Sequence, residues 1–535
     1  MEVFESFGFE QEIIKLWDPI TDDAVWMRDV DGRFYRAERE TRPLPLRTRW
    51  VGGLLQQAVI ENIIKQHIKS ISPIQVEYES VPTSLWFDEA EINDPDGYPC
   101  IINLRRRKST KEDAATNDHD QLPQNTETVR AKYVIGADGG KSWTRKQLGF
   151  AMEGNKTDSI WGVIDLIVIS DFPDIEGGNL FFFRRERGMT RFYVQLNRGK
   201  VTENLCRESV TQETIIEKIR YMLRPYTVAV KNCEWWSAYT VAQHLSTGMT
   251  KNGRAFLVGD AVHTHSPLVG QGMNVGMQDS YNLGWKLAGV IRKQFDSKIL
   301  DTFEIERRPV AEQLVEVDQI YLQLFDAPKG KEPEWLLERA AQLEPFLMGL
   351  SVNYSTSPLT ALSSTSTQAT NLLPSDLSER IIPGRRFPEM TVYNHASGKL
   401  YPLQRLLRAN GNFHVIVFAG DISQLEKRNL MNRAGTGLES IQKGLQLKLN
   451  IFAIHRTTRA AVELANMHDI FFPFDETMGR DYDRVYCDLD VTYEEAGIDI
   501  GGGIVVVRPD QYVSWTGGLD NTDGLREYFE HVFRT

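Results

Sequence analysis

The chain has 535 residues, of which 41% are hydrophobic and 10% aromatic, a composition that supports buried cores and argues against global disorder. At about 100–200 residues per domain, this length predicts about three domains. The formal net charge is -12. Electrostatic binding to nucleic acid requires a basic surface, so the negative net charge argues against a nucleic-acid partner. It favours a neutral or weakly acidic small molecule as the ligand.

Cysteine usage indicates a reducing compartment. The four cysteines, Cys100, Cys206, Cys233 and Cys487, are far apart in the sequence and form neither a C-x-x-C motif nor a zinc-ligand spacing. No apolar run is long enough to span a membrane, and the N-terminus lacks the basic start of a signal peptide. We therefore expect a cytoplasmic protein with no membrane partner.

The N-terminus is expected to form an amphipathic helix that carries Val3, Phe4, Phe7, Ile13 and Leu16 on its apolar side. A nucleotide-binding domain normally begins with a strand, a glycine turn and a helix. No such unit precedes this helix in the sequence, so we expect the opening strand–turn–helix segment to be missing.

The next 270 or so residues alternate strands and helices. Residues 54–68 have helical spacing, and the polar stretch 105–128 is typical of a mobile surface loop within a hairpin. An antiparallel sheet is predicted from the runs 161–169, 191–196 and 233–241. Short buried strands are predicted at 133–140 and 255–259, and helices at 274–292 and 299–325.

The C-terminal third differs in composition. Residues 326–380 differ in composition from the rest of the chain, and residues 355–370, which are mostly Ser and Thr, are typical of a linker or a loosely packed connector. Beyond residue 385, the runs 413–418, 445–454 and 503–507 predict strands separated by helical stretches. This alternation predicts a small α/β domain.

The first motif is a strand that leads into a glycine turn at Asp138, Gly139 and Gly140. The following Lys and Ser imitate a phosphate-binding loop, but that loop requires glycine where Ile135 stands. Asp138 has two interpretations. Its carboxylate binds a ribose or ribityl hydroxyl, or it caps the helix that follows.

The second motif runs from a strand through a loop into a helix. Asp260 follows the strand, Pro267 restricts the loop, and Gly270 and Gly272 permit close backbone approach where the helix begins. A helix N-terminus offers free N–H groups to an anion or a polarised carbonyl, such as the pyrimidine edge of a flavin. The pair His263 and His265 also suggests a metal site, but this interpretation is weaker than the flavin one, because no further ligand has suitable local spacing.

These motifs resemble those of single-component flavoprotein aromatic hydroxylases. The segment at Gly259 and Asp260 is similar to the family's second flavin motif, and the segment at Asp138 and Gly139 is similar to its shared motif near FAD and the NADPH path. Four further runs resemble the phenol 2-monooxygenase branch: Phe4–Gly8, Ile160–Asp165, Asp171–Asp174 and Arg191–Gln195. The resemblance covers essentially the whole chain.

The resemblance implies an α/β fold in which a Rossmann-like FAD-binding domain, truncated at its N-terminus, carries an inserted antiparallel-sheet substrate domain and a C-terminal thioredoxin-like domain. The implied segments follow in chain order. They are an FAD-binding first part (1–144), a substrate-binding sheet domain (145–252), an FAD-binding second part with helices (253–325), a linker (326–384) and a thioredoxin-like dimerisation domain (385–535). A homodimer is the implied assembly.

The resemblance also implies roles for individual residues. Asp260 is expected to bind the ribityl chain of FAD, and Gly270, Gln271, Gly272, Met273 and Asn274 to face the isoalloxazine. Gln57 resembles a glutamine that contacts FAD, although its pattern also fits a solvated helix residue. Tyr193 resembles a tyrosine near the phenol pocket, or it is a sheet residue in the core. Pro267 is expected to line the reactive face of the flavin.

The implied reaction uses FAD, NADPH and dioxygen. NADPH reduces FAD, dioxygen forms a flavin hydroperoxide, and a phenolic substrate is hydroxylated ortho to its hydroxyl, while the protein supplies orientation, a base and exclusion of water. Two alternatives stay open. One is a catalytically inactive relative, and the other is an oxidoreductase of the same fold that acts on a polyketide-like aromatic.

The sequence departs from the family pattern in several places. The family's Gly-x-Gly-x-x-Gly, its ribose-binding acid and its active-site Asp before the Phe4–Gly8 run are not found. The chain as given is therefore expected to bind FAD poorly or not at all, and not to turn over. Ser159 stands where the family often has a substrate-contacting Tyr. The C-terminal region has no C-x-x-C, so dithiol chemistry is not expected there.

Overall fold

The computed structural model describes residues 1–41, 48–106, 125–173, 182–196, 207–327, 332–355, 357–360, 381–488, 493, 496–499 and 501–534. The chain divides into two units. The first, here the sheet unit, comprises 1–74 and 154–243, and the second, here the helix unit, comprises 75–153 and 244–535. The predicted domain boundaries differ from this division and stay predictions.

The N-terminus forms two short helices rather than the single predicted one. α1 (Glu2–Phe7) ends at Gly8, whose left-handed φ of 85° terminates the helix, and α2 (Glu10–Ile14) follows. α3 (Gln57–Ile71) confirms the predicted helix near residues 54–68. Strands β2 (Asp22–Arg28) and β3 (Phe34–Thr41) form an antiparallel hairpin, and β1 (Asp18–Pro19) pairs with β4 (Gly53–Leu54).

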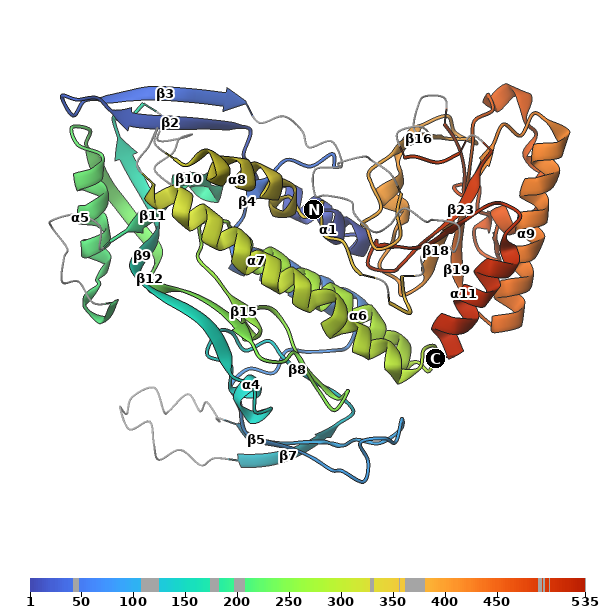
Figure 1. The fold of residues 1–535 in the computed structure, drawn as a ribbon, viewed down its shortest axis with the longest axis horizontal. Helices are drawn as coiled ribbons and strands as arrows, with labels where there is room; N and C mark the ends of the chain where they lie inside the picture. Colours follow the sequence, from blue (N-terminus) through green and yellow to red (C-terminus); the bar gives the residue numbers. More distant parts are fainter. Residues whose placement is uncertain are drawn as a thin grey trace. The chain divides into compact units, whose positions relative to one another are not determined.

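An antiparallel sheet dominates the sheet unit and confirms three predicted strands (Figure 1). In their order across the sheet, its described strands are β10 (Phe182–Arg185), β11 (Met189–Gln195), β9 (Met152–Ser170) and β12 (Val228–Ser246). In the helix unit, His244 and Leu245 at the end of β12 pair with β15 (His263–Thr264). α5 (Gln212–Met222) covers one face, where Phe192 and Val194 join its core. Because side chains alternate along a strand, Arg191, Tyr193 and Gln195 lie on the other face.

The helix unit contains the strands that lead into both motifs. β8 (Val134–Gly136) pairs in parallel with β14 (Ala255–Leu257), which also pairs with β13 (Thr250–Lys251). β14 is fully buried, as predicted. The prediction of a buried strand before Asp138 is wrong in part, because β8 is an edge strand of the described sheet and Ile135 is 49% exposed.

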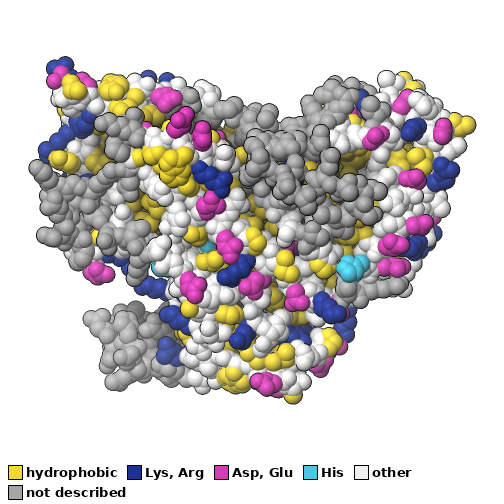
Figure 2. All heavy atoms as spheres, viewed as in Figure 1, with side chains coloured by type: hydrophobic (Ala, Val, Ile, Leu, Met, Phe, Trp, Pro, Cys, Tyr) yellow, Lys and Arg dark blue, Asp and Glu magenta, His cyan; other side chains and the backbone are white. Residues whose placement is uncertain are grey.

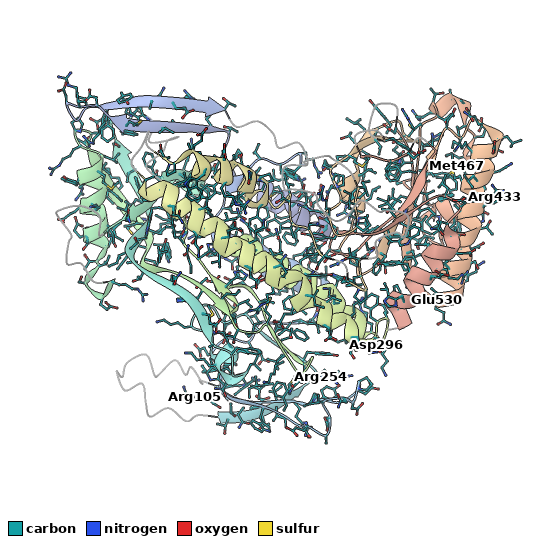
Figure 3. The ribbon with its side chains drawn as sticks, in the orientation of Figure 1. Arg105, Arg254, Asp296, Arg433, Met467 and Glu530 are labelled. Atoms are coloured by element: carbon teal, nitrogen blue, oxygen red, sulfur yellow. The ribbon has the colours of Figure 1, made fainter. Side chains whose placement is uncertain are left out.

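A second sheet of the helix unit confirms the predicted hairpin. β5 (Ser80–Phe87), β6 (Cys100–Arg106) and β7 (Asn125–Ala131) form an antiparallel meander. The polar loop between β6 and β7 lies outside the described residues, as does Cys206. Arg254, labelled in Figure 3, precedes β14 and donates hydrogen bonds to the carbonyls of Ile92 (2.9 Å) and Asp94 (2.6 Å), which ties this meander to β14.

Two long helices follow the motifs and lie side by side in Figure 1. α6 (Gly272–Ile291) and α7 (Thr302–Asp326), joined by a short 3-10 turn (Ser297–Asp301), confirm both predicted helices. Most of the predicted connector, residues 355–370, lies outside the described residues. The segment 326–384, which the resemblance assigns to a linker, also contains a helix. α8 (Glu334–Leu347) packs on α7 because Leu336 and Leu343 give it a buried apolar side.

The C-terminal part of the helix unit contains a sheet with both parallel and antiparallel strand pairs. Its described strands, in sheet order, are β17 (Leu400–Pro402), β16 (Thr391–Asn394), β22 (Val485–Cys487), β19 (Leu449–His455), β18 (Phe413–Gly420), β23 (Gly503–Val507) and β24 (Val513–Gly517). A small hairpin pairs β20 (Phe474–Asp475) with β21 (Gly479–Arg480). α9 (Leu425–Leu445) extends to Leu445, so the strand predicted from that residue begins later, at Leu449.

This C-terminal sheet shares its core with α6 and α7. α11 (Thr522–Arg534) packs against α9, and Phe413 of β18 makes edge-to-face contacts with Trp285 of α6 and Phe529 of α11, at ring-centroid distances of 5.7 and 5.8 Å. Edge-to-face aromatic pairs of this kind add to the stabilisation from buried area. The thioredoxin-like assignment of this region stays a prediction.

A cluster of buried charges links the same parts. Arg508, just after β23, donates a bidentate pair of hydrogen bonds to Glu306 of α7, at 2.6 and 2.9 Å, and a further pair to Asp510. Lys286 of α6 lies 2.8 Å from the same Glu306 carboxylate. Two cations thus meet two carboxylates in a site with almost no exposure, where an unpaired charge is strongly destabilising.

Burial alone would raise the pKa of Glu306, but Arg508 and Lys286 outweigh it and lower the pKa from 4.5 to about 2. A depressed carboxylate pKa stabilises the fold above its ordinary value, and that contribution is lost as pH falls from about 4.5 toward 2. Acid should therefore weaken the junction between α7 and the C-terminal sheet.

We predict that Glu306→Gln lowers the free energy of unfolding by about 3–5 kcal/mol at pH 7, because two buried cations lose a carboxylate. Urea titrations followed by circular dichroism measure the change, and its size should shrink below pH 4.5. Glu316→Gln on the same helix is the control, since its ion pair with Arg339 is partly exposed and worth at most about 1 kcal/mol. Equal effects of the two substitutions would contradict the assignment.

Candidate functional site

The turns at Asp138 and Asp260 lie at the same edge of the parallel strand pair. Gly136 of β8 is the register partner of Leu257 of β14, so both strands end side by side and both chains turn there. Ligand sites of open α/β sheets lie at the carboxyl ends of parallel strands. The fold therefore brings together two motifs that are about 120 residues apart in the sequence.

Asp138 uses its carboxylate within its own turn. It accepts hydrogen bonds from the Ser142 hydroxyl (2.5 Å) and from the backbone amide and hydroxyl of Thr144 (2.9 and 3.0 Å), at the start of α4 (Trp143–Gln147). Burial opposes ionisation, but these hydrogen bonds hold the pKa of Asp138 below its usual range. The geometry supports the capping interpretation over direct contact with a ligand.

Arg145 joins the two turns. Its buried guanidinium donates one hydrogen bond to the carbonyl of Gly140 and another to the carbonyl of Ala261, each at 2.9 Å. These carbonyls belong to the Asp138 turn and the Asp260 turn respectively. Sequence reasoning missed Arg145, because an arginine in the first turn of a short helix carries no signal of a partner 116 residues away.

Asp260 lies in a 3-10 turn (Gly259–Ala261) directly after β14, and its side chain is exposed. It makes no side-chain hydrogen bond to another residue that the structure describes. The turn packs closely on α6, since a Cβ added to Gly276 would lie 3.2 Å from the Cα of Gly259. Asp260 is therefore a carboxylate on a rigid turn, available to a ligand.

Asp279 of α6 fixes that turn. Its carboxylate accepts hydrogen bonds from the backbone amide of Gly259 (3.0 Å), from Nε2 of His263 (3.0 Å) and from Nε of Arg307 (2.6 Å). Burial would raise the pKa of Asp279, but Arg307, His263 and the Gly259 amide outweigh it and lower the pKa. Asp279 was not predicted from the sequence, although a polar residue on the buried side of an apolar helix is a usable signal.

The start of α6 offers backbone donors. Gln271 is the N-cap but makes no side-chain cap, so the amides of Gly272, Met273 and Asn274 have no acceptor within the helix. Gly270 has a left-handed φ of 62°, with open space where a side chain would project. The helix dipole adds positive potential at this end.

The loop that leads to α6 is held from α7. Asp318 accepts hydrogen bonds from the backbone amide of Ser266 (2.9 Å) and from the Ser266 hydroxyl, and both residues are buried. Pro267 follows, and its carbonyl accepts from the amide of Gly270 at 3.0 Å, which closes a turn. Pro267 is thus ordered by a buried Ser–Asp pair, which the sequence did not reveal.

Two predicted site residues belong to the sheet unit. Gln57 is the first residue of α3 and is exposed, as in its solvated interpretation. Tyr193 lies opposite the apolar core of its sheet, with its ring 6.2 Å from that of Phe183, so the alternative of a core residue is not supported.

Tyr193 adjoins a buried ion cluster. Arg191, two residues earlier on β11, binds Asp165 of β9 with two hydrogen bonds of 2.7 Å, and Arg185 binds the same carboxylate at 3.0 Å. Burial opposes the charge of Arg191, but Asp165 and the Tyr193 side chain outweigh it and raise its pKa. The face of the sheet that carries Tyr193 is therefore polar and rigid.

The described residues contain no cluster of three or more His, Cys, Asp or Glu side chains that could hold a metal ion. Within the same residues, no helix is long and apolar enough to cross a membrane. Acidic and basic side chains are interspersed on the face shown in Figure 2.

Two family models match the chain. An FAD-binding domain matches residues 104–318, which include both strand-end turns and α6, and the C-terminal dimerisation domain of phenol hydroxylase matches residues 352–535.

Curated relatives cover nearly all of the chain. FAD-dependent monooxygenase ankC of Aspergillus thermomutatus is 52% identical over 100% of this chain and 90% of its own length. FAD-dependent monooxygenase hkm7 of Aspergillus hancockii is 40% identical over 100% and 99%. Phenol 2-monooxygenase fsqG of Aspergillus fumigatus is 31% identical over 99% and 88%. The chain belongs to the FAD-dependent monooxygenases.

Solved structures support the fold. The flavin-dependent monooxygenase PieE, in complex with FAD and substrate, superposes with a TM-score of 0.71 at 19% identity, covering 100% of this chain and 90% of PieE. Aklavinone-11 hydroxylase with FAD and aklavinone has a TM-score of 0.66 at 19% identity, with coverages of 100% and 90%. The predicted flavoprotein hydroxylase family and C-terminal dimerisation domain are confirmed. The predicted N-terminal truncation gains no support from these comparisons and stays a prediction.

We predict that Arg145→Met loosens both turns, because two backbone carbonyls lose their donor. An unsatisfied buried polar group costs about 1–3 kcal/mol. Hydrogen exchange followed by mass spectrometry should show faster exchange in peptides that span 138–144 and 259–263. The neighbouring exposed Lys146, changed to Met, is the control. Unchanged exchange in Arg145→Met would show that the guanidinium does not hold the turns.

Proposed function

We propose that this chain is an FAD- and NADPH-dependent monooxygenase that hydroxylates a phenolic aromatic substrate ortho to its hydroxyl group. The observation that carries the proposal is the pair of strand-end turns joined by Arg145, beside the uncapped start of α6. A rigid carboxylate and a row of backbone donors at one sheet edge suit a ligand with both a polyol and a polar ring.

The residues present fit FAD. Asp260 is exposed and makes no side-chain hydrogen bond within the described chain, so it is available to the ribityl hydroxyls. The residues Gly270, Gln271, Gly272, Met273 and Asn274 are proposed to hold the pyrimidine edge of the ring by backbone amides. Gln57 is proposed as a further FAD contact. Bound FAD supplies electron transfer and dioxygen activation, while the protein supplies position and electrostatics.

The chain's own residues orient the substrate and exclude water. Tyr193 presents a phenolic hydroxyl beside Arg191, and we propose that it hydrogen-bonds the substrate hydroxyl and holds its proton. Pro267 has no side-chain donor, and we propose that it packs on the ring face and keeps water away. Asp138 acts as a positioning residue, since its carboxylate organises the turn that Arg145 holds.

A larger biosynthetic aromatic is the second candidate substrate. The structural neighbours include aklavinone-11 hydroxylase bound to aklavinone and CabE, an aromatic hydroxylase from angucycline biosynthesis. Both are below 25% identity and show the fold alone. They therefore add polycyclic phenols to the substrates to be tested, but they do not decide which substrate class this chain uses. The inactive-relative alternative predicts a protein without bound flavin.

Asp260→Ala should weaken FAD binding, because a charge-assisted hydrogen bond contributes about 1.5–3 kcal/mol. At 1.4 kcal/mol per tenfold, this loss corresponds to a rise in Kd of roughly 10- to 150-fold. Quenching of flavin fluorescence measures Kd, and Asp520→Ala, which removes another exposed carboxylate, is the control. An unchanged Kd in Asp260→Ala would reject the ribityl-binding role.

The full chain with excess FAD should oxidise NADPH in a substrate-dependent way and incorporate one atom of labelled dioxygen into a phenolic aromatic. Mass spectrometry of products, run with phenol and with polycyclic phenols, measures incorporation and distinguishes the two substrate classes. Product with the polycyclic set alone would favour the biosynthetic alternative. A protein that retains no flavin would favour the inactive relative and the weak binding expected from the sequence.

A further inference from the structure

His265 is a buried titratable side chain whose role the motifs leave unexplained. Only 6% of its side chain is exposed. Nδ1 lies 2.6 Å from the carbonyl oxygen of Ser266, so Nδ1–H donates there and the neutral ring keeps its lone pair on Nε2. Within the described chain, Nε2 makes no hydrogen bond.

Nε2 faces the start of α6. A Cβ built on Gly272 would lie 3.3 Å from Nε2 and 3.6 Å from Cε1 of His265, so this edge of the ring abuts the first residue of the helix. The position coincides with the amides proposed to face the flavin. On a side chain with 6% exposure, a ring nitrogen without a hydrogen-bond partner in the described chain is therefore directed to the place where negative charge is expected to be bound.

Some neighbours of His265 favour its neutral form, and others favour its protonated form. Burial lowers its pKa below 6.5, and His263 on β15 acts in the same direction. Asp318 of α7, whose Oδ1 lies 4.0 Å from Nδ1, opposes them, as do the Ser266 carbonyl and Asp260 of the strand-end turn. On α6, Asp279 is already engaged by His263 and Arg307, so it does not serve His265 directly.

We propose that His265, supported by Asp318, takes up a proton when negative charge develops at the N-terminus of α6, and that the new Nε2–H group then faces that charge. The proposal rests on the proposed FAD site. When bound, FAD would accept a hydride, which carries two electrons and one proton, from NADPH, the reductant of the proposed function, and would become anionic. A second proton, from solvent, would bind Nε2 of His265. His265, supported by Asp318, thus supplies a positive charge opposite the negative charge of the reduced flavin, and this positive charge is absent while the flavin is oxidised.

The test is the pH dependence of the flavin midpoint potential. Uptake of two protons with two electrons gives a slope of about 59 mV per pH unit, and uptake of one proton gives about 30 mV, since a tenfold change is 29.6 mV for a two-electron couple. Between pH 7 and 8.5, the full chain saturated with FAD should show the steeper slope. His265→Gln, which keeps a polar side chain but cannot titrate, should show the shallower one.

His468→Gln is the matched control, because His468 Nε2 also lies 4.0 Å from a carboxylate oxygen, that of Glu439, but belongs to the C-terminal sheet region. Its slope should equal that of the unmodified protein. Asp318→Asn is the second variant and should narrow the pH range of the steep slope, because His265 loses its nearest carboxylate. A role in loop structure alone would change stability but not the slope.

Two outcomes would overturn the inference and are distinguishable. In the first outcome, both the unmodified protein and His265→Gln bind FAD and their midpoint potentials change with pH at the same slope. This result would reject the proton-uptake role and leave the FAD site intact. A protein that takes up no FAD even at saturating concentration would reject the proposed function together with this inference.

Discussion

Asp279 is the carboxylate on which the geometry of the candidate site depends. From the buried side of α6 it holds the Gly259 amide, the His263 ring and the Arg307 guanidinium at once. A buried carboxylate is stable only when it is fully partnered, so these groups are fixed together. The Asp260 turn is therefore rigid, and its exposed carboxylate is directed without rearrangement toward the ligand that we propose.

The same principle recurs along α6 and α7. Asp318 fixes the loop before α6 through Ser266, and Glu306 binds Lys286 and Arg508 where the C-terminal sheet meets both helices. The C-terminal region thus shares its core and its buried charges with the helices that carry the proposed flavin site. The domain that matches a family model named for dimerisation thus also packs against α6, the helix that we propose to bind the cofactor.

Sequence patterns predicted the elements that carry a regular signal. The apolar periodicity located α3, α6 and α7, and the strand-end acids and glycines located both turns, because strand, turn and helix starts have local chemistry. Long-range pairing has no such signal. Arg145 finds its second partner on Ala261, and Asp318 finds Ser266, only after the chain has folded. For the same reason, the sequence could not choose between the two roles of Asp138.

The central claim is that one rigid edge, formed by the two strand-end turns and the start of α6, binds FAD. Its most direct test is a crystal structure of the full chain grown with FAD. We predict density for the ribityl chain beside the Asp260 carboxylate, and for the pyrimidine edge of the ring against the amides of Gly272, Met273 and Asn274. Flavin density elsewhere, with Asp260 and these amides facing solvent, would contradict the account.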